Sequence, residues 1–364
     1  MPRYHELISK QQNGLERFNH RQDLLRRIEA KTGRPIIVYA ANLNLSNIPN
    51  SLDHTDLTPF SDLTRTIKGD SLDVLLHSPG GLAEAAERIV HLLRARFKSV
   101  RFIIPHTAFS AATMLAASAD ELVLDDTSAL GPIDPQIQFR DPQTGQSTIV
   151  PTQTILEGFE NAKIDIKADP EVLGVYLPLL SKLDLALFEI CKNANKLAET
   201  LVVEWLKTYL LKDEADPAAR AKEVTEYLSS HKERLSHGRP ITLGTVKDVL
   251  KIKRVVDLKS DPVLRDLILE LWAEIEWFIE SSGTAKFFEN AYGVAFRRAF
   301  QIQQQVGVFP FPFLPQPAPQ PQPPQPPPAP ARSDAPSRPL SAGAIRVVDS
   351  VLRARVPESA IRRD

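Results

Sequence analysis

Apolar and polar positions follow two periods along the first third of the chain. Short apolar runs typical of buried strands lie at 35–40, 71–78, 100–105 and 121–125. Apolar residues at helical spacing lie between and before them, at 15–31, 82–93 and 111–118. Strands and helices that alternate in this way predict parallel β-α-β units, in which each helix packs on the sheet.

The second half of the chain has a different pattern. Residues 152–232 and 262–302 are mostly helical in pattern, and KRVVDL at 253–258 is a short strand candidate between them. We therefore expect an α/β fold with a helical elaboration. The predicted folded body is one domain that extends over residues 1–308.

Proline dominates the segment that follows the body. Residues 310–330 hold 12 of the 30 prolines, interspersed with Gln and Ala. Such a segment has little to bury, so we expect a disordered linker over 309–339, used as a spacer or as a docking site for a proline-binding partner. Residues 340–364 form a short tail, in which 344–355 have the pattern of an amphipathic helix with three arginines.

Composition and charge narrow the function classes. The 44 basic and 45 acidic residues are balanced, so we expect neither a nucleic-acid partner nor a membrane-surface role. Cys191 is the single cysteine, which excludes an internal disulfide and a cysteine metal cluster. The sequence has no HExxH motif and no glycine-rich phosphate loop, so we expect no metal, no cofactor and no ATPase activity in this chain.

The hydropathy of the chain indicates its cellular compartment. No apolar run approaches the roughly 18 residues of a spanning helix, and the N-terminus is polar. We therefore expect a cytoplasmic protein without a transmembrane segment.

Two strand ends carry the candidate chemistry. SPGG (78–81) closes one strand, and Ser110 lies between a strand and a helix in PHTAFSAATMLA. Glycine leaves backbone N–H groups open to a substrate, so the amides of Gly81 and Ala111 could form an oxyanion hole. Taken alone, SPGG is explained by a structural turn and Ser110 by a helix N-cap. Their combination favours a nucleophilic serine.

These segments also carry a family resemblance. LLHSPGGLAEAAERIVHLLR and IIPHTAFSAATMLAASADELVLDDTSALGPIDPQ resemble the Clp-protease/crotonase superfamily, and more closely the SDH-type serine proteinases related to signal peptide peptidase A. The resemblance is strong over residues 71–136 and extends diffusely to about residue 300. It implies a repeated β-β-α superhelix that assembles into homo-oligomers and acts on peptides or unfolded segments, including those of membrane proteins.

The same resemblance assigns roles at the site. Ser110 would be the nucleophile, Gly81 with Gly80 and Ala111 would form the oxyanion hole, and GPIDP (131–135) would shape the floor of the site. The general base stays open. No histidine occurs between His106 and His231, which argues against the Clp order of the triad and favours a Ser-Lys dyad.

Three residues are the main candidates for the base. Lys163 lies at the sequence distance that the signal peptide peptidase branch uses, although its charged flanks are also typical of a surface lysine. Lys182 lies in an apolar stretch that would depress the pKa of a buried lysine, or would let it snorkel. His237 lies in a segment resembling the loop that carries the Clp triad aspartate, or it helps the turn beside Gly238. His77 and His106 are secondary candidates.

A serine peptidase is the leading functional prediction, and two alternatives stay open. The first is crotonase-type acyl-thioester chemistry, with Glu84 or Asp134 as the acting carboxylate. The second is a non-catalytic scaffold with the same fold, which recruits partners through its proline-rich tail. The absence of the Clp-type histidine keeps the second alternative open.

Overall fold

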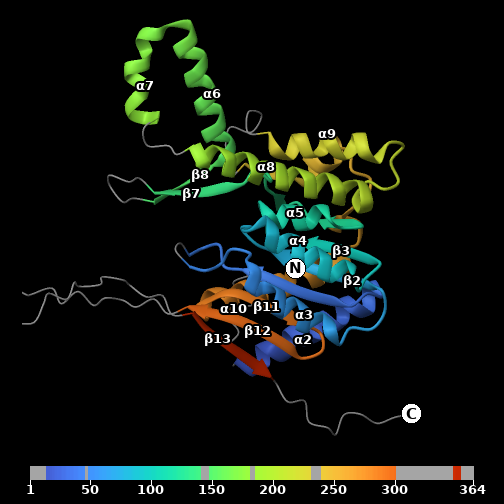
Figure 1. Cartoon of the computed structure of the whole chain (residues 1–364). Coiled ribbons are helices and arrows are strands. Elements are labelled where there is room, and N and C mark those ends of the chain that lie inside the picture. The colour runs from blue at the N-terminus through green and yellow to red at the C-terminus, as the bar shows by residue number, and fades with distance from the viewer. Residues whose placement is uncertain are drawn as a thin grey trace, which may run out of the picture.

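The computed structural model describes residues 14–46, 49–140, 147–180, 185–230, 239–300 and 347–353. Within these residues, eight strands form a central sheet in the order β10–β5–β3–β2–β1–β11–β12–β13 (Figure 1). The strands are β1 (Ile36–Ala41), β2 (Ser71–His77), β3 (Ser99–Ile104), β5 (Glu121–Leu124), β10 (Val255–Asp257), β11 (Thr284–Asn290), β12 (Val294–Phe300) and β13 (Val347–Arg353). The first five are mutually parallel and the last three antiparallel, so the sheet is mixed.

Two smaller sheets accompany the central one. β4 (Thr107–Ala108), β6 (Ala129–Leu130) and β9 (Ile241–Thr242) form the first of them. The second is a hairpin of β7 (Gln136–Arg140) and β8 (Ser147–Pro151). The hairpin leads directly into the helical elaboration.

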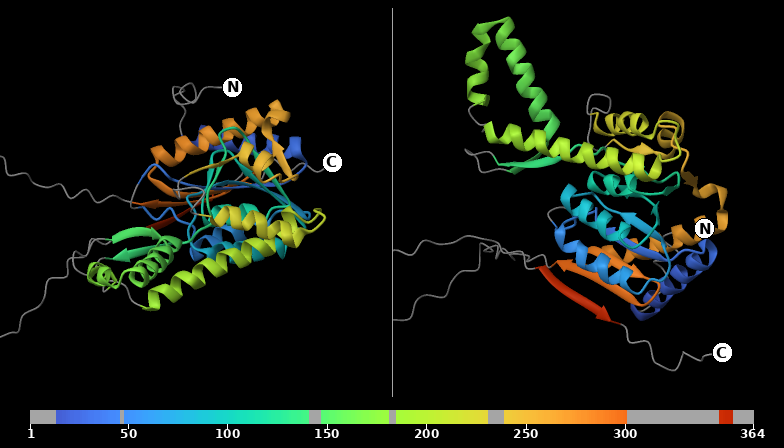
Figure 2. Two further views of the ribbon diagram at one scale, coloured as in Figure 1. Left: turned by 90° about the horizontal axis from the view of Figure 1, so that it is seen from above. Right: turned by 45° about the vertical axis from the view of Figure 1, so that its right-hand side comes forward.

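Helices cover both faces of the central sheet, as the two views in Figure 2 show. One face is covered by α3 (Leu57–Arg65), α4 (Ala83–Arg94) and α5 (Ala111–Ala117), and the opposite face by α2 (Gly14–Thr32) and α10 (Pro262–Ser281). A further layer on α5 consists of α8 (Leu185–Trp205) and α9 (Pro217–Ser229). Among the described residues, no helix combines the length and apolar character needed to cross a bilayer.

Strand periodicity decides which side chain faces which helical layer. Successive residues of a strand point to opposite faces. Leu72, Val74 and Leu76 of β2 therefore pack with α3, α4 and α5, whereas Leu75 packs with α2 and α10. The same alternation continues to the strand ends, so His77 follows Leu75 to the α10 face and Ser78 lies on the α5 side.

The first part of the helical elaboration extends from the body as an arm. It is built of α6 (Thr152–Ala168) and α7 (Leu173–Leu180), which project beyond the sheet and its helical layers (Figure 1). Large apolar side chains of this arm are solvent-exposed, namely Ile164, Leu173, Val175, Leu177 and Leu179. The arm therefore presents an apolar surface that the described part of the chain leaves uncovered.

Most predicted elements agree with the structure, and two predictions are wrong. Residues 262–302 are not helical throughout, because α10 ends at Ser281 and β11 and β12 follow. Gly283, at φ +62°, allows the chain to reverse there, and β11 then pairs with β1. The tail segment 344–355 is not a helix, because Val347–Arg353 forms β13 beside β12. The proline-rich linker lies outside the described residues.

A buried ion cluster ties the loop before α3 to the central sheet. Lys286 of β11 is 0% exposed, and its Nζ lies 2.8 Å from Asp53 Oδ2 and 2.9 Å from Asp56 Oδ2. Asp53 also caps the short helix His54–Asp56 by accepting a hydrogen bond from the Thr55 N–H. Burial raises the pKa of Asp56 despite the opposing charge of Lys286. The cluster fixes the loop that begins at Leu52.

Replacing Lys286 should reveal how much of the stability depends on this cluster. Lys286→Met leaves a buried carboxylate without its main partner, and we expect a loss of about 3–5 kcal/mol in the free energy of unfolding. We expect a loss near the lower end of this range, because Arg298 lies 3.6 Å from Asp53 and still pairs with this carboxylate. Urea denaturation measures the loss. The control Lys98→Met removes an exposed lysine paired with Asp70 and should cost under about 1 kcal/mol. Equal effects of the two substitutions would contradict a structural role of the cluster.

Candidate active site

Ser110 occupies a strained turn between β4 and α5. Its backbone has φ 51° and ψ −122°, a conformation that residues with a side chain rarely adopt. Ser110 stands at the N-cap position of α5, but its side chain makes no capping hydrogen bond within the described residues. This finding speaks against the alternative in which Ser110 serves only as a helix cap. Nucleophilic serines of α/β hydrolases occupy a comparable strained strand-to-helix turn.

Gly80 lies directly against this turn. A Cβ atom at position 80 would lie 2.4 Å from the Phe109 carbonyl oxygen and 2.6 Å from the Ser110 Cβ. Gly80 also has φ +94°, in the region that favours glycine. The Phe109 N–H donates a hydrogen bond to the Ser78 carbonyl at 3.0 Å, which holds the two segments together. The structure thus brings SPGG and Ser110 into contact, as the sequence predicts.

Gly81 is held by a backbone segment that the sequence analysis does not include. Leu52 forms a parallel bridge with Gly81, in which the Leu52 N–H donates to the Gly80 carbonyl at 2.7 Å and the Leu82 N–H donates to the Leu52 carbonyl at 2.9 Å. These bonds do not use the N–H of Gly81. A Cβ at position 81 would lie 2.2 Å from the Leu52 carbonyl oxygen, so only glycine fits.

The loop GPIDP (131–135) packs beside the serine turn. A Cβ on Gly131 would lie 2.8 Å from the Phe109 ring, which places this loop against the residue before Ser110. The buried Thr113 connects the same parts, since its Oγ1 lies 2.7 Å from the Ala108 carbonyl oxygen and accepts from the Gly131 N–H at 3.0 Å. The loop is therefore part of the wall around Ser110.

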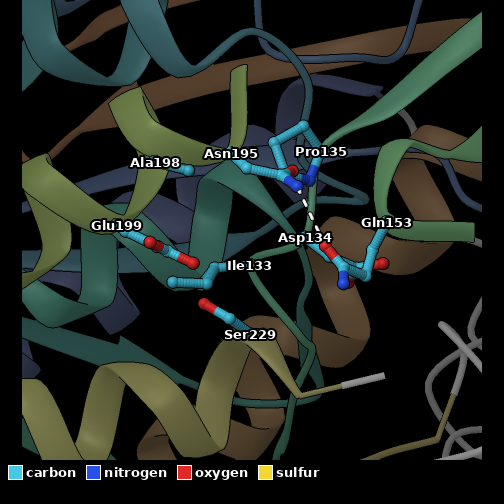
Figure 3. Close-up of a pocket in the computed structure, with 8 residues that line it drawn as sticks. All are labelled: Ile133, Asp134, Pro135, Gln153, Asn195, Ala198, Glu199 and Ser229. Carbon is cyan, nitrogen blue, oxygen red and sulfur yellow. Dashed lines mark hydrogen bonds between the residues drawn. The ribbon is translucent and has the colours of Figure 1, made fainter. Parts of the chain in front are cut away.

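A small cavity lies behind this loop (Figure 3). It measures about 20 Å³ and is lined by Ile133, Asp134, Pro135, Gln153, Asn195, Ala198, Glu199 and Ser229. Asn195 donates a hydrogen bond to Gln153 across it at 3.2 Å. Burial, and then the charge of Glu226, raises the pKa of Glu199. A cavity of this size accommodates about one water molecule, so it is too small for a peptide side chain.

The candidates for the general base are not brought to Ser110 in the described part of the chain. Lys163 lies on α6, its side chain is 46% exposed, and its Nζ pairs with Glu160 at 2.8 Å. These are the surroundings of a solvated lysine. Lys182 and His237 lie outside the described residues. Within the described residues, no lysine or histidine side chain hydrogen-bonds Ser110.

The two secondary histidines lie on the other side of the sheet. The His77 ring packs on Trp272 of α10 at 4.3 Å between ring centroids, and its Nδ1 accepts from the Thr107 N–H at 3.2 Å. The Nδ1 atom of His106 lies 2.7 Å from the Thr107 hydroxyl oxygen. Burial, with a smaller effect of His106, lowers the pKa of His77 to about 3. Both histidines thus face α10 rather than Ser110.

Sequence reasoning missed two contributors to the site, Leu52 and the cluster of Lys286 with Asp53 and Asp56. The only local signal was the capping pattern of Asp53 with Asp56, which fixes a short helical turn. The pairing with a lysine about 230 residues further on has no local signal. In the described ranges, no group of three or more His, Cys, Asp or Glu side chains is placed to hold a metal ion.

A serine on a strained strand-to-helix turn is an arrangement that serine hydrolases with an α/β sheet use. The chain belongs to the ClpP-like SDH-type serine proteinase family, whose model matches residues 5–261. The fold is thus the Clp-like α/β fold that the sequence predicts.

The chain is also similar to two curated proteins of unknown function. The chain is 32% identical over 182 residues to the uncharacterized protein MJ0137 of Methanocaldococcus jannaschii, covering 50% of this chain and 53% of the relative. It is 32% identical over 178 residues to MJ1495 of the same organism, covering 49% and 50%. The chain therefore spans about half the length of the curated relatives that it matches.

Among solved structures, the chain is similar to a mutant of the 1510-N membrane-bound stomatin-specific protease, with 18% identity over 30% of this chain and 54% of the other, at a TM-score of 0.25. It is also similar to a ClpP1 mutant from Listeria monocytogenes, with 11% identity over 64% and 94% of the two chains, at a TM-score of 0.30. The family assignment rests on the family model.

The contact of Gly80 with the serine turn can be tested with a matched glycine. Gly80→Ala combines an unfavourable φ with a clash, whereas a Cβ at Gly69, which has φ +91°, would meet no atom of the described residues within 4 Å. We expect Gly69→Ala to cost about 1 kcal/mol and Gly80→Ala at least about 3 kcal/mol. Chemical denaturation measures both. Similar costs would mean that the backbone of residue 80 does not touch the serine turn in solution.

The buried His77 predicts acid sensitivity. Because its folded pKa is near 3 and its ordinary value is 6.5, the unfolded chain binds the proton more readily between these values. Stability should thus fall as the pH drops from about 6.5, by up to about 1.4 kcal/mol per pH unit. His77→Gln should remove this part of the slope in denaturation curves between pH 6.5 and 4. An unchanged slope would show that His77 is not buried in its neutral form.

Proposed function

We propose that this protein is a serine peptidase in which Ser110 is the nucleophile and the N–H groups of Gly81 and Ala111 form the oxyanion hole. The observation that carries the proposal is the contact of Gly80 with the Ser110 turn, so close that a Cβ at position 80 would lie 2.6 Å from the serine Cβ. This contact supports the proposal because Gly81 follows Gly80 directly in the chain, and family membership supplies the reaction class.

The reaction proceeds in two stages. Ser110 Oγ attacks the carbonyl carbon of a peptide bond while the general base takes the hydroxyl proton, and the oxyanion is stabilised by the two N–H groups. The C–N bond then breaks, and the base returns the proton to the leaving amine. Water, activated by the same base, hydrolyses the acyl-enzyme ester and regenerates the Ser110 hydroxyl.

We assign the general base to Lys182 or His237. Lys163 is a weaker candidate, because a lysine base must lose its solvation to be neutral near pH 7, and this side chain is half exposed and paired with Glu160. Lys182 follows the apolar helix α7, and His237 precedes β9, which pairs with β6 close to the loop 131–135.

The substrates that we propose are peptides or unfolded protein segments, and the working form is a homo-oligomer. The apolar arm of α6 and α7 supports the second part, since an exposed apolar surface of this kind is typical of a contact between chains. The proposal includes three further points. The peptidase needs no ATPase in the same chain, and it acts in the cytoplasm. It recruits a partner through its proline-rich segment.

A fluorophosphonate probe tests the nucleophile. We expect the wild type to be labelled and Ser110→Ala to be unlabelled, because the probe reacts only with an activated serine. Ser61→Ala, which removes an exposed hydroxyl from α3, is the control and should label normally. Mass spectrometry of the labelled peptide and labelling at several protein concentrations complete the test, the latter because an oligomer could assemble the site.

The same assay assigns the base. Alanine at either position 182 or position 237 should slow labelling by about 10²–10⁴-fold, while Lys163→Ala should stay within about threefold of the wild type. A large loss in Lys163→Ala would reassign the base to the arm. Absence of labelling of the folded wild type at every concentration would favour the non-catalytic scaffold, and labelling in Ser110→Ala would overturn the assignment of the nucleophile.

A further inference from the structure

A second pocket opens on the face of the sheet opposite to Ser110. It lies at the carboxyl ends of β1 and β2, under α10, and measures about 50 Å³. Ligands of open α/β proteins bind outside the carboxyl ends of the strands. The polar and aromatic groups of its lining are Asn42, Asn44, His77, His106, Trp272, Glu276 and Glu280. The proposed peptidase mechanism uses none of them.

Asn42 supplies an unused hydrogen-bond donor. Its side chain is 2% exposed, and its Oδ1 accepts from the Asn44 N–H at 3.0 Å. Its Nδ2 is buried and has no hydrogen-bond partner among the described residues. Burying an amide NH₂ without a partner is costly, so a group that accepts hydrogen bonds is expected next to it.

His77 supplies a second donor. Its Nδ1 accepts from the Thr107 N–H, so the neutral ring carries its proton on Nε2. The ring is 5% exposed, and it lines the same pocket. Two N–H donors cannot coordinate a cation, but they match the oxygen atoms of a carboxylate.

The α10 side of the pocket carries carboxylate groups. Glu276 lines it together with Glu280, and burial and the charge of Glu280 raise the pKa of Glu276. Glu280 accepts a hydrogen bond from Asn44 Nδ2 at 2.5 Å, which leaves Glu276 as the half-buried carboxylate without this partner. Trp272 lines the same side of the pocket, one helical turn before Glu276. This side is suited to an ammonium group.

We propose that this pocket binds a small free α-amino acid, with its carboxylate on Asn42 and His77 and its ammonium group on Glu276. The size of the pocket limits the ligand. A volume of about 50 Å³ holds roughly three to five water molecules, so the five non-hydrogen atoms of glycine fill it and alanine exceeds it by one atom. The site does not depend on Ser110, because it lies on the other face of the sheet.

The test is a titration of the full chain with glycine, alanine and leucine, followed by tryptophan fluorescence and by saturation-transfer NMR. We expect glycine and alanine to bind and leucine to bind at least about tenfold more weakly, because its side chain exceeds the pocket. Acetate and methylammonium, which each carry half of the ligand, should also bind at least about tenfold more weakly. Trp272→Phe should remove the fluorescence change, and Trp277→Phe should keep it.

Two isosteric variants locate the ligand. Asn42→Asp keeps an oxygen that accepts from the Asn44 N–H and replaces the Nδ2 donor by a second oxygen. Glu276→Gln removes the negative charge that would bind the ammonium group. Each should weaken glycine binding at least about tenfold, whereas Glu204→Gln on the exposed face of α8 should not. If Asn42→Asp does not fold, Glu276→Gln, which changes only a half-buried side chain, carries the test. Ser110→Ala should bind glycine as the wild type does, which separates this proposal from the proposed peptidase.

Three outcomes would overturn the proposal. The first is no saturation transfer and no fluorescence change with glycine or alanine. The second is acetate binding as tightly as glycine, which would mean a simple anion site. The third is unchanged glycine binding in Glu276→Gln and Asn42→Asp, which would place the ligand elsewhere on the protein.

Discussion

The close approach of Gly80 to the Ser110 turn is the constraint on which the candidate site depends. No side chain fits at position 80, where the nearest atoms would be the Phe109 carbonyl and the serine Cβ. The contact joins the end of β2 to the start of α5, so the two halves of the site are positioned by backbone atoms. Such a contact is rigid, which suits an oxyanion hole, because its donors must be fixed before the charge develops.

A strand that is distant in sequence stabilises the segment that pairs with these glycines. Leu52 pairs with the glycine segment, and the residues after Leu52 are held by Lys286 of β11. Burying a lysine costs free energy unless its charge is paired. Here Asp53 and Asp56 pair with Lys286, and the Tyr39 hydroxyl donates a hydrogen bond to Asp56. The antiparallel edge of the sheet is therefore connected to the serine site, although it is distant in sequence.

The central sheet separates the two proposed sites, which differ in chemistry. On the α5 side lie Ser110 and the glycine amides, which suit acyl transfer by a member of the ClpP-like SDH-type serine proteinase family. On the α10 side lie neutral donors and a carboxylate, which suit a small zwitterion. Both sites use the carboxyl ends of the same strands, where the Thr107 backbone bonds to His77 and to Ser78. Free amino acids are also the final products of peptide hydrolysis, so the two proposals are chemically compatible.

The sequence alone determined the parallel strands β1, β2, β3 and β5, the helices α2, α4 and α5 and the candidates SPGG and Ser110, because local apolar periods and glycines report directly on backbone conformation. It could also have assigned His77 to the face opposite Ser78, by counting along β2. It failed at β11 and β12, whose apolar residues after Gly283 suit either a helix or a buried strand. Only the tertiary structure decided that choice, the pairing of Leu52 with Gly81 and the pocket at Asn42. These features arise from contacts between distant segments, and no local pattern records which segments will meet.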